Sequence, residues 1–187
     1  MAPSTPTLWT PTLWTLRPAR VGDAITIAEL RAVVLRPDLT RLGRYDPVRV
    51  RERLLGSFTP RHTTVIEVAG AVAGCVALRP AAGELWLEHF YLRPDLHGHG
   101  IGSAVLRTQL DRADAGGLPV RLNVLQGSAA RRLYERHGFT VTAADPIDVY
   151  MLRPAGIVSP PVAVSPAATV SSAVTGPDGA GAASTTA

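Results

Sequence analysis

A glycine-rich turn between a strand pattern and a helix pattern constrains this chain more than any other feature. Residues 85–92 are mostly apolar and aromatic, which predicts a buried strand, and Arg-Pro-Asp at 93–95 ends it because proline cannot continue a ladder. Residues 97–102, His-Gly-His-Gly-Ile-Gly, lead directly into a helical pattern at 103–107. This order directs unpaired backbone N–H groups and the positive end of a helix dipole towards one point. The stretch therefore predicts an anion site, above all for phosphate.

The spacing of these glycines does not match the two commonest phosphate-binding fingerprints. No Gly-Lys-Ser/Thr is present, so the turn is not a nucleotide P-loop. The G-x-G-x-x-G spacing is also missing, which disfavours a dinucleotide-binding fold. Glycines alone would fit a flexible turn equally well, and it is the position between a strand and a helix that favours the anion site.

Length, composition and cysteine content predict a single cytoplasmic domain. The 187 residues can bury a real core, and a hydrophobic fraction of 46% argues against wholesale disorder. No apolar run approaches the ~20 residues of a membrane span, and the first residues lack the pattern of a signal peptide. Cys75 is the one cysteine of the sequence, so no disulfide can form within the chain, and we expect a packed core thiol.

The charged residues give weaker information about partners. All 19 basic side chains are arginines, and they fall within residues 17–153 together with all acidic residues except Asp178. This modest positive excess suits an anionic ligand, although a generally arginine-rich surface explains it as well. The arginines do not line one helix with interleaved aromatic side chains, so we expect no nucleic-acid partner, and we expect no membrane partner.

Residues 14–153 are predicted to form the domain, with a disordered extension at 1–13 and a disordered tail at 154–187. The pentapeptide Thr-Pro-Thr-Leu-Trp occurs twice over residues 5–14, too few copies for a repeat fold, and is interpreted as a short duplication. The tail is rich in Ala, Pro, Ser and Thr and carries almost no charge, so it cannot bury enough surface to offset its ordering entropy.

Helical and strand periodicities alternate along the domain. A helix is predicted over residues 24–35, with Asp23 as N-cap and Pro37 as its end, and a second helix begins with Asp46 as N-cap and Pro47 at its first position. The predicted apolar faces comprise Ile25, Ala28, Val33 and Leu35 in the first helix and Val50, Leu54 and Leu55 in the second. The arginines expected on the solvent face of the second helix are Arg49, Arg51 and Arg53. Further strands are predicted over 62–68, 72–79, 120–125, 139–142 and 147–152, and further helices over 101–115 and 129–137.

Two motifs, in order along the chain, carry a family resemblance. Leu-Arg-Pro-Asp-Leu-His-Gly-His-Gly-Ile-Gly occupies residues 92–102 after an apolar strand, and Leu-Tyr-Glu-Arg-His-Gly-Phe occupies residues 133–139. With the opening Leu-Arg-Pro-Ala at residues 16–19, they resemble the GNAT superfamily of acyl-CoA-dependent N-acyltransferases over residues 14–153. The resemblance implies a single α/β domain with a mixed, mostly antiparallel sheet flanked by helices.

The resemblance also implies a site for acetyl-CoA as co-substrate. The family signature is Gln or Arg, two residues, Gly, one residue, then Gly or Ala, and His97 takes the first position here. Backbone amides of residues 97–102 would bind the pyrophosphate of coenzyme A, and the end of the preceding strand would pair with the pantetheine arm. Ser128 stands where many relatives have an asparagine that contacts this arm. The implied cofactor-binding residues are Phe90, Tyr91, Leu92, His97, Gly98, His99, Gly100, Ile101, Gly102, Ser103 and Ser128.

The same resemblance implies a general acid. Tyr134 matches the tyrosine that protonates the leaving thiolate in many members of the family. A tyrosine has an ordinary pKa of about 10, so it is protonated at neutral pH and able to act as an acid. The backbone N–H of Leu92 would polarise the thioester carbonyl in the manner of an oxyanion hole. Without the motif, Tyr134 would be interpreted as a half-buried aromatic residue.

A base for the attacking amine is less clearly indicated. Glu88 lies among aromatic residues, where a carboxylate is costly without a partner. It is therefore either a catalytic group, as a base or as a binder of a cationic substrate, or the partner of an arginine. His89 is interpreted as a packed histidine, and Asp145 and Asp148 either surround an acceptor pocket or face solvent. We expect no metal site, because His97, His99 and His137 are too scattered along the chain to form one.

We therefore expect transfer of an acetyl group from acetyl-CoA to a primary amine by direct attack, with no covalent enzyme intermediate. The acceptor is expected to be a small-molecule or peptide amine, and the sequence leaves a homodimer open. Two alternatives stay open at this point: a non-catalytic module that binds and senses acyl-CoA, and a transferase that uses another acyl-CoA.

Overall fold

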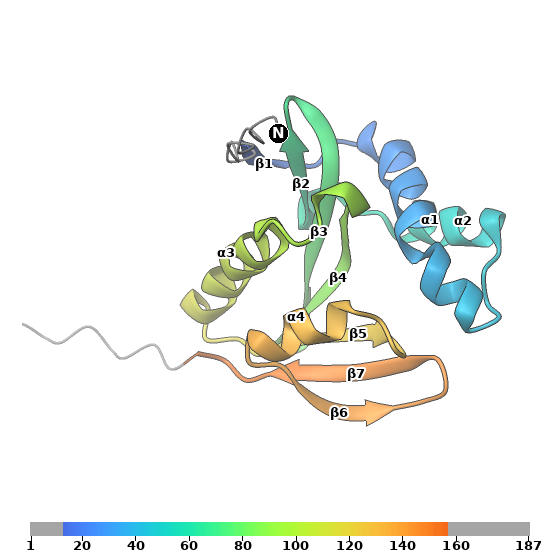
Figure 1. Cartoon of the computed structure of the whole chain (residues 1–187). Coiled ribbons are helices and arrows are strands. Elements are labelled where there is room, and N and C mark those ends of the chain that lie inside the picture. Colours follow the sequence, from blue (N-terminus) through green and yellow to red (C-terminus); the bar gives the residue numbers. More distant parts are fainter. Residues whose placement is uncertain (1–12, 157–187) are drawn as a thin grey trace, which may run out of the picture.

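The computed structural model describes residues 13–156, which fold into a seven-stranded sheet with helices on both faces (Figure 1). In sheet order the strands are β1 (Trp14–Pro18), β2 (Thr63–Val68), β3 (Ala71–Ala81), β4 (Glu84–Leu92), β5 (Val120–Leu125), β7 (Asp148–Arg153) and β6 (Thr140–Ala144). Neighbouring strands are antiparallel except β4 and β5, which are parallel. The predicted mixed, mostly antiparallel α/β class is confirmed. Most of the two predicted disordered flanks, residues 1–12 and 157–187, lies outside the described residues.

Two helix pairs cover opposite faces of the sheet (Figure 1). α1 (Asp23–Arg41) and α2 (Pro47–Ser57) pack around a cluster that includes Ile27, Leu54 and Cys75. On the other face, α3 (Ile101–Ala115) and α4 (Ala130–Arg136) contribute to the larger core cluster. Two short 3-10 helices, η1 (Pro60–His62) and η2 (Pro94–Leu96), precede β2 and follow β4. Within residues 13–156, no helix combines the length and the hydropathy needed to cross a membrane.

β4 and β5 are paired only where they begin. Leu85 lies opposite Val120 and Trp86 opposite Arg121, and their pairing stops there. Further along β4, His89 has a positive φ of 52°, and the pairing with β3 shifts register close to it. A bulge of this kind bends a strand and increases its twist. The far ends of β4 and β5 therefore separate and open the sheet between the two helix pairs.

α1 continues through Pro37, so the predicted end of this helix is wrong. Proline removes a single N–H bond, to the carbonyl of Val33, and the Val33 side chain is 56% exposed, so this turn faces solvent that can bond the freed carbonyl. The predicted apolar faces are confirmed in part, since Ala28, Val50 and Leu54 are buried and Leu35 packs against the core. The exposed members are Ile25 (71%), Val33 and, in α2, Leu55 (47%). The buried residues of α1 are Ile27, Ala28 and Ala32.

The predicted N-cap of α2 is confirmed and that of α1 is wrong. Asp46 accepts the backbone N–H groups of Val48 and Arg49, both at 2.9 Å from Oδ1. Asp23 is instead the first residue of α1, and its carboxylate pairs with the Arg17 guanidinium at 2.8 Å. The ion pair joins the start of α1 to β1. A capping pattern in the sequence describes one helix by itself and cannot predict such a contact.

Candidate functional site

A cavity of about 1280 Å³ opens where β4 and β5 separate. Its wall comes from β4, β5 and the β6–β7 connection, from the loop before α3 and from α4 on one side, and from α1 and α2 on the other, so it reaches both faces of the sheet. Most of the predicted site residues line it. They are Glu88, Phe90, Tyr91, Leu92, His97, Gly98, Gly100, Gly102, Ser103, Ser128 and Tyr134. Of the other two, Ile101 is buried in the core, and His99 is exposed outside this wall.

The glycine-rich loop of the sequence prediction lies at the N-terminus of α3. Gly98 and Gly100 have φ values of 80° and 78°, the left-handed region that a side chain would strain. The ring of His97 donates from Nε2 to the carbonyl of Leu92 at 2.9 Å, which ties the loop to the end of β4. The first turn of α3 has unpaired N–H groups and the positive end of its dipole here, so the loop can bind an anion.

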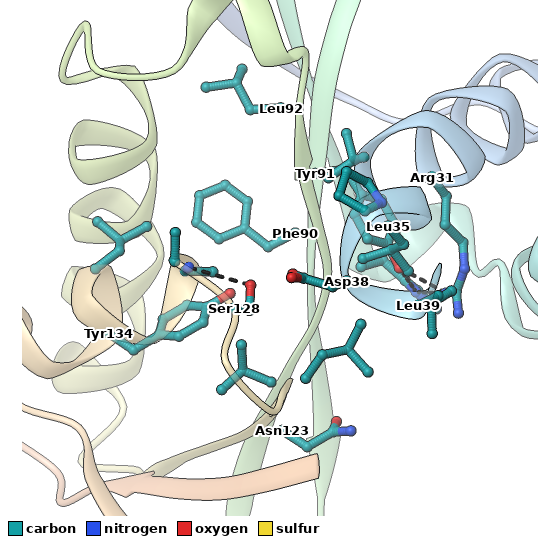
Figure 2. A pocket seen from close by; sticks show the side chains of 18 of the residues that line it. Arg31, Leu35, Asp38, Leu39, Phe90, Tyr91, Leu92, Asn123, Ser128 and Tyr134 are labelled. Atoms are coloured by element: carbon teal, nitrogen blue, oxygen red, sulfur yellow. Dashed lines mark hydrogen bonds between the residues drawn. The ribbon is translucent and has the colours of Figure 1, made fainter. Parts of the chain in front are cut away.

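The end of β4 presents different side chains to the two halves of the cavity (Figure 2). Phe90 points towards α3 and α4, whereas Tyr91 is buried against α1. The hydroxyl of Tyr91 accepts a hydrogen bond from Arg31 at 2.7 Å. Any contact of Tyr91 with a ligand in the α3–α4 half therefore falls to its backbone.

Tyr134 projects from α4 into the α3–α4 half of the cavity, with its hydroxyl towards Ser128 (Figure 2). The residue is 7% exposed, and its ring meets Phe139 edge to face at 5.8 Å between centroids. Burial raises the pKa of Tyr134 above its ordinary value, so the hydroxyl keeps its proton at neutral pH. Ser128 accepts the backbone N–H of Ala130 at 3.4 Å, at the start of the same helix.

Glu88 and His89 both line the cavity. Glu88 forms an ion pair with Arg79, at 3.0 Å between Oε1 and Nε, which is the arginine partner that its position anticipated. The imidazole of His89 lies between Ser57, at 3.1 Å from Nε2, and the Tyr91 hydroxyl, at 3.3 Å from Nδ1. Burial lowers the pKa of His89, so the ring is neutral near pH 7 and packed, as expected.

Cys75 is fully buried on the α1–α2 side of the sheet. Its thiol donates to the backbone carbonyl of His89 at 3.0 Å, and burial raises the pKa of the thiol to about 12. Because the thiolate is the nucleophilic form of cysteine, this side chain is inert at neutral pH. The predicted packed thiol is confirmed.

Among the acidic residues of the cavity, Asp38 comes from a segment that the sequence left unassigned, whereas Asp145 and Asp148 were considered in advance. Asp38 extends from the last part of α1 into the cavity (Figure 2) and pairs with Arg41 at 3.0 Å. It was missed because the helix was predicted to stop at Pro37. Asp145 and Asp148 both line the cavity from the β6–β7 connection and the start of β7, as one of the two interpretations proposed.

Comparison with known proteins agrees with this architecture. Residues 59–141 match the family model for the acetyltransferase (GNAT) domain. Three solved structures share the fold: the PaiA N-acetyltransferase of Thermoplasma acidophilum in complex with coenzyme A, the ribosomal-protein-S18-alanine N-acetyltransferase of Escherichia coli, and an N-acetyltransferase of Staphylococcus aureus Mu50.

The likeness to these structures lies in the fold, because the sequences have diverged widely. The Thermoplasma protein is 20% identical with a TM-score of 0.64, over 76% of this chain and 99% of its own. The Escherichia coli enzyme is 17% identical with a TM-score of 0.59, over 80% and 99%. The Staphylococcus protein is 19% identical with a TM-score of 0.58, over 74% and 98%. The region matched by the family model includes the glycine loop and the Tyr134 motif, and these structures share the fold across the sheet, so the predicted resemblance to the GNAT acetyltransferases is confirmed.

Proposed function

We propose that this protein transfers an acetyl group from acetyl-CoA to a primary amine by direct attack. The observation that carries the proposal is the cavity between β4 and β5, which joins the glycine loop at α3 to the Tyr134 hydroxyl and continues to the α1–α2 side. One end suits a phosphate-bearing donor, and the other end is open for an acceptor. The Thermoplasma acidophilum protein of the same fold was solved in complex with coenzyme A, which supports this donor class.

The residues present fit coenzyme A. Backbone N–H groups of residues 97–102 would bind its pyrophosphate at the positive end of α3. The edge of β4 beyond Trp86 is free of β5, so the backbone of residues 90–92 can pair with the amides of the pantetheine arm. Ser128 lies across the cavity from this edge and offers a hydroxyl to the same arm (Figure 2). The acetyl end would then lie near Tyr134.

The chemistry needs a polarised carbonyl, a neutral amine and a proton for the leaving sulfur. The N–H of Leu92 would stabilise the developing oxyanion. As the C–N bond forms and the C–S bond breaks, Tyr134 would give its proton to sulfur and regain one from solvent. Glu88 would accept the proton of the amine, directly or through water. With Cys75 buried as a thiol, attack proceeds without an acyl-enzyme.

Tyr134→Phe tests the proposal because it removes the hydroxyl and keeps the ring that packs on Phe139. We expect kcat for amine acetylation to fall by about 10²- to 10⁴-fold, the usual contribution of a general acid. The rise in melting temperature caused by acetyl-CoA should stay unchanged. Turnover equal to that of the native protein would contradict the acid role.

Two alternatives are separated by the same assays. A non-catalytic sensor would bind acetyl-CoA and acetylate no amine in a broad panel, with or without Tyr134. A transferase with another donor would turn over faster with a longer acyl-CoA than with acetyl-CoA. The glycine loop would contact the part of the donor that all acyl-CoA molecules share, so it does not select the acyl group. The comparison of turnover with acetyl-CoA and with a longer acyl-CoA tests whether acetyl is the group transferred.

A further inference from the structure

The α1–α2 half of the cavity carries a set of arginines that lack acidic partners. The four that line it are Arg31 on α1, Arg44 in the connection to α2, and Arg49 and Arg53 on α2. Within residues 13–156, none of the four forms an ion pair, whereas Arg51, between two of them on α2, pairs with Glu29 away from the cavity. On α2, the arginines of the cavity side thus lack an ion-pair partner, whereas the arginine of the outer side has one.

The carboxylates of the same cavity are already engaged. Asp38 pairs with Arg41 and Glu88 with Arg79, and both of these arginines lie outside the wall. The other acidic residues of the wall accept hydrogen bonds from backbone N–H groups or from neutral side chains; they are Asp46, Asp145 and Asp148. These hydrogen bonds leave the negative charges of the three aspartates in place. Five arginines of the wall, the four named above and Arg136 on α4, form no ion pair within residues 13–156, so the unpaired charges of the wall sum to a positive value.

Arg31 is the most firmly placed of the four arginines. Its guanidinium lies over the Tyr91 ring, 5.7 Å from the centroid, donates to the Tyr91 hydroxyl at 2.7 Å, and approaches Nδ1 of His89 at 3.5 Å. Its Nε is buried and has no hydrogen-bond acceptor among residues 13–156. A guanidinium has five N–H donors arranged to match a carboxylate or a phosphate, so the pinned Arg31 retains donors for an anion.

This anion is not the donor's pyrophosphate. The glycine loop and Tyr134 belong to the α3–α4 face, whereas Arg31 packs with Tyr91 on the face covered by α1 and α2 (Figure 2). The arginines therefore stand where the acceptor enters, across β4 from the site of the phosphates.

We propose that the acceptor amine carries an anionic group, a carboxylate or a phosphate, which Arg31 binds with help from Arg49 and Arg53. The inference rests on the proposed function and adds its substrate class. It predicts discrimination against polyamines and other acceptors that carry only positive charge, since these would meet uncompensated guanidinium groups.

The test compares acceptors that differ only in the anionic group. Amino acids and dipeptides are paired with their C-terminal amides, 2-aminoethylphosphonate is compared with 2-aminoethanol, and spermidine represents the polyamines. We expect kcat/KM for at least one anionic member to exceed that of its neutral partner about tenfold or more, as hydrogen bonds between charged groups imply. Preference for the carboxylate or for the phosphonate identifies the anion.

Variants assign the preference to these arginines. Arg31→Met and the double variant Arg49→Gln/Arg53→Gln should raise KM for the anionic acceptor and remove its advantage, with a smaller change in kcat. The controls are Arg36→Met, from the same helix and over the Tyr45 ring at 5.6 Å outside the cavity wall, and Arg51→Gln on α2. Both controls should keep the preference.

The outcomes separate the inference from the proposed function. Equal turnover of acids and amides, or preference for spermidine, by an enzyme that acetylates amines would overturn the anionic site alone. Binding of acetyl-CoA with no turnover of any amine would overturn the proposed function instead. In that case the anionic site is judged by melting temperature in saturating coenzyme A: a further rise with an anionic amine, lost in Arg31→Met, supports it, and no rise overturns it.

Discussion

Two buried tyrosines in one cavity show how neighbours set the role of a residue. Burial raises the pKa of both Tyr91 and Tyr134, so both keep their protons at neutral pH. The Tyr91 hydroxyl is bound by Arg31, whereas the Tyr134 hydroxyl has no hydrogen-bond partner among residues 13–156. A proton can be delivered only by a group that is free to approach the leaving atom. Tyr134 meets this condition, which supports the acid role proposed for it, whereas the Tyr91 hydroxyl is held by Arg31.

At the scale of single residues, Glu88→Gln distinguishes the base from a structural ion pair. The amide keeps the size of the side chain but cannot accept the amine proton, so we expect kcat/KM to fall by about 10²- to 10⁴-fold. The matched control is Glu84→Gln on the same strand, since Glu84 pairs with Arg121 at 3.0 Å and does not line the cavity. The measurement is steady-state acetylation with melting temperature as a check of folding. If both variants lose the same small amount of activity, Glu88 is structural.

At the scale of elements, α2 presents arginines to the cavity along one face and is fixed at its start by Asp46. Arg49 and Arg53 are spaced by about one turn, which places both on the side of buried Val50, while Arg51 lies on the outside. The sequence placed all three arginines on the solvent face. Arg49 and Arg53 are exposed, as predicted, and Arg51 is half-buried. Arg49 and Arg53 also line the cavity, and that depends on where α2 packs rather than on its own periodicity.

Loss of the α2 cap should lower stability by a small and measurable amount. Asp46→Ala removes the acceptor of two backbone N–H groups, and we expect the melting temperature to fall by about 2–5 °C. Asp46→Asn, which can still accept these hydrogen bonds, should stay close to the native value. A fall of equal size in both variants would show that charge, rather than capping, is what Asp46 contributes.

At the scale of the whole molecule, local signals predicted the strand, the glycine loop and the helix of residues 84–115 closely, because turn chemistry and periodicity act over a few residues. The α1–α2 side of the cavity was poorly predicted. Asp38 lay beyond a proline that a helix pattern treats as an end, and Arg31 acquires its place only through Tyr91, which lies 60 positions away in the sequence. Contacts of that range come from how the layers pack, and a single sequence does not display them.

The central claim, that the loop at α3 binds the phosphates of acetyl-CoA, is tested most directly by thermal unfolding of the full chain. Acetyl-CoA at about 100 times its Kd should add roughly 2.7 kcal/mol, a rise of about 5–10 °C for a domain of this size. Gly100→Asp, which strains the loop and adds a negative charge, should abolish the rise. Gly83→Asp, at a positive φ of 73° in the β3–β4 turn outside the cavity wall, should keep it. No rise for the native chain at millimolar acetyl-CoA would contradict the claim.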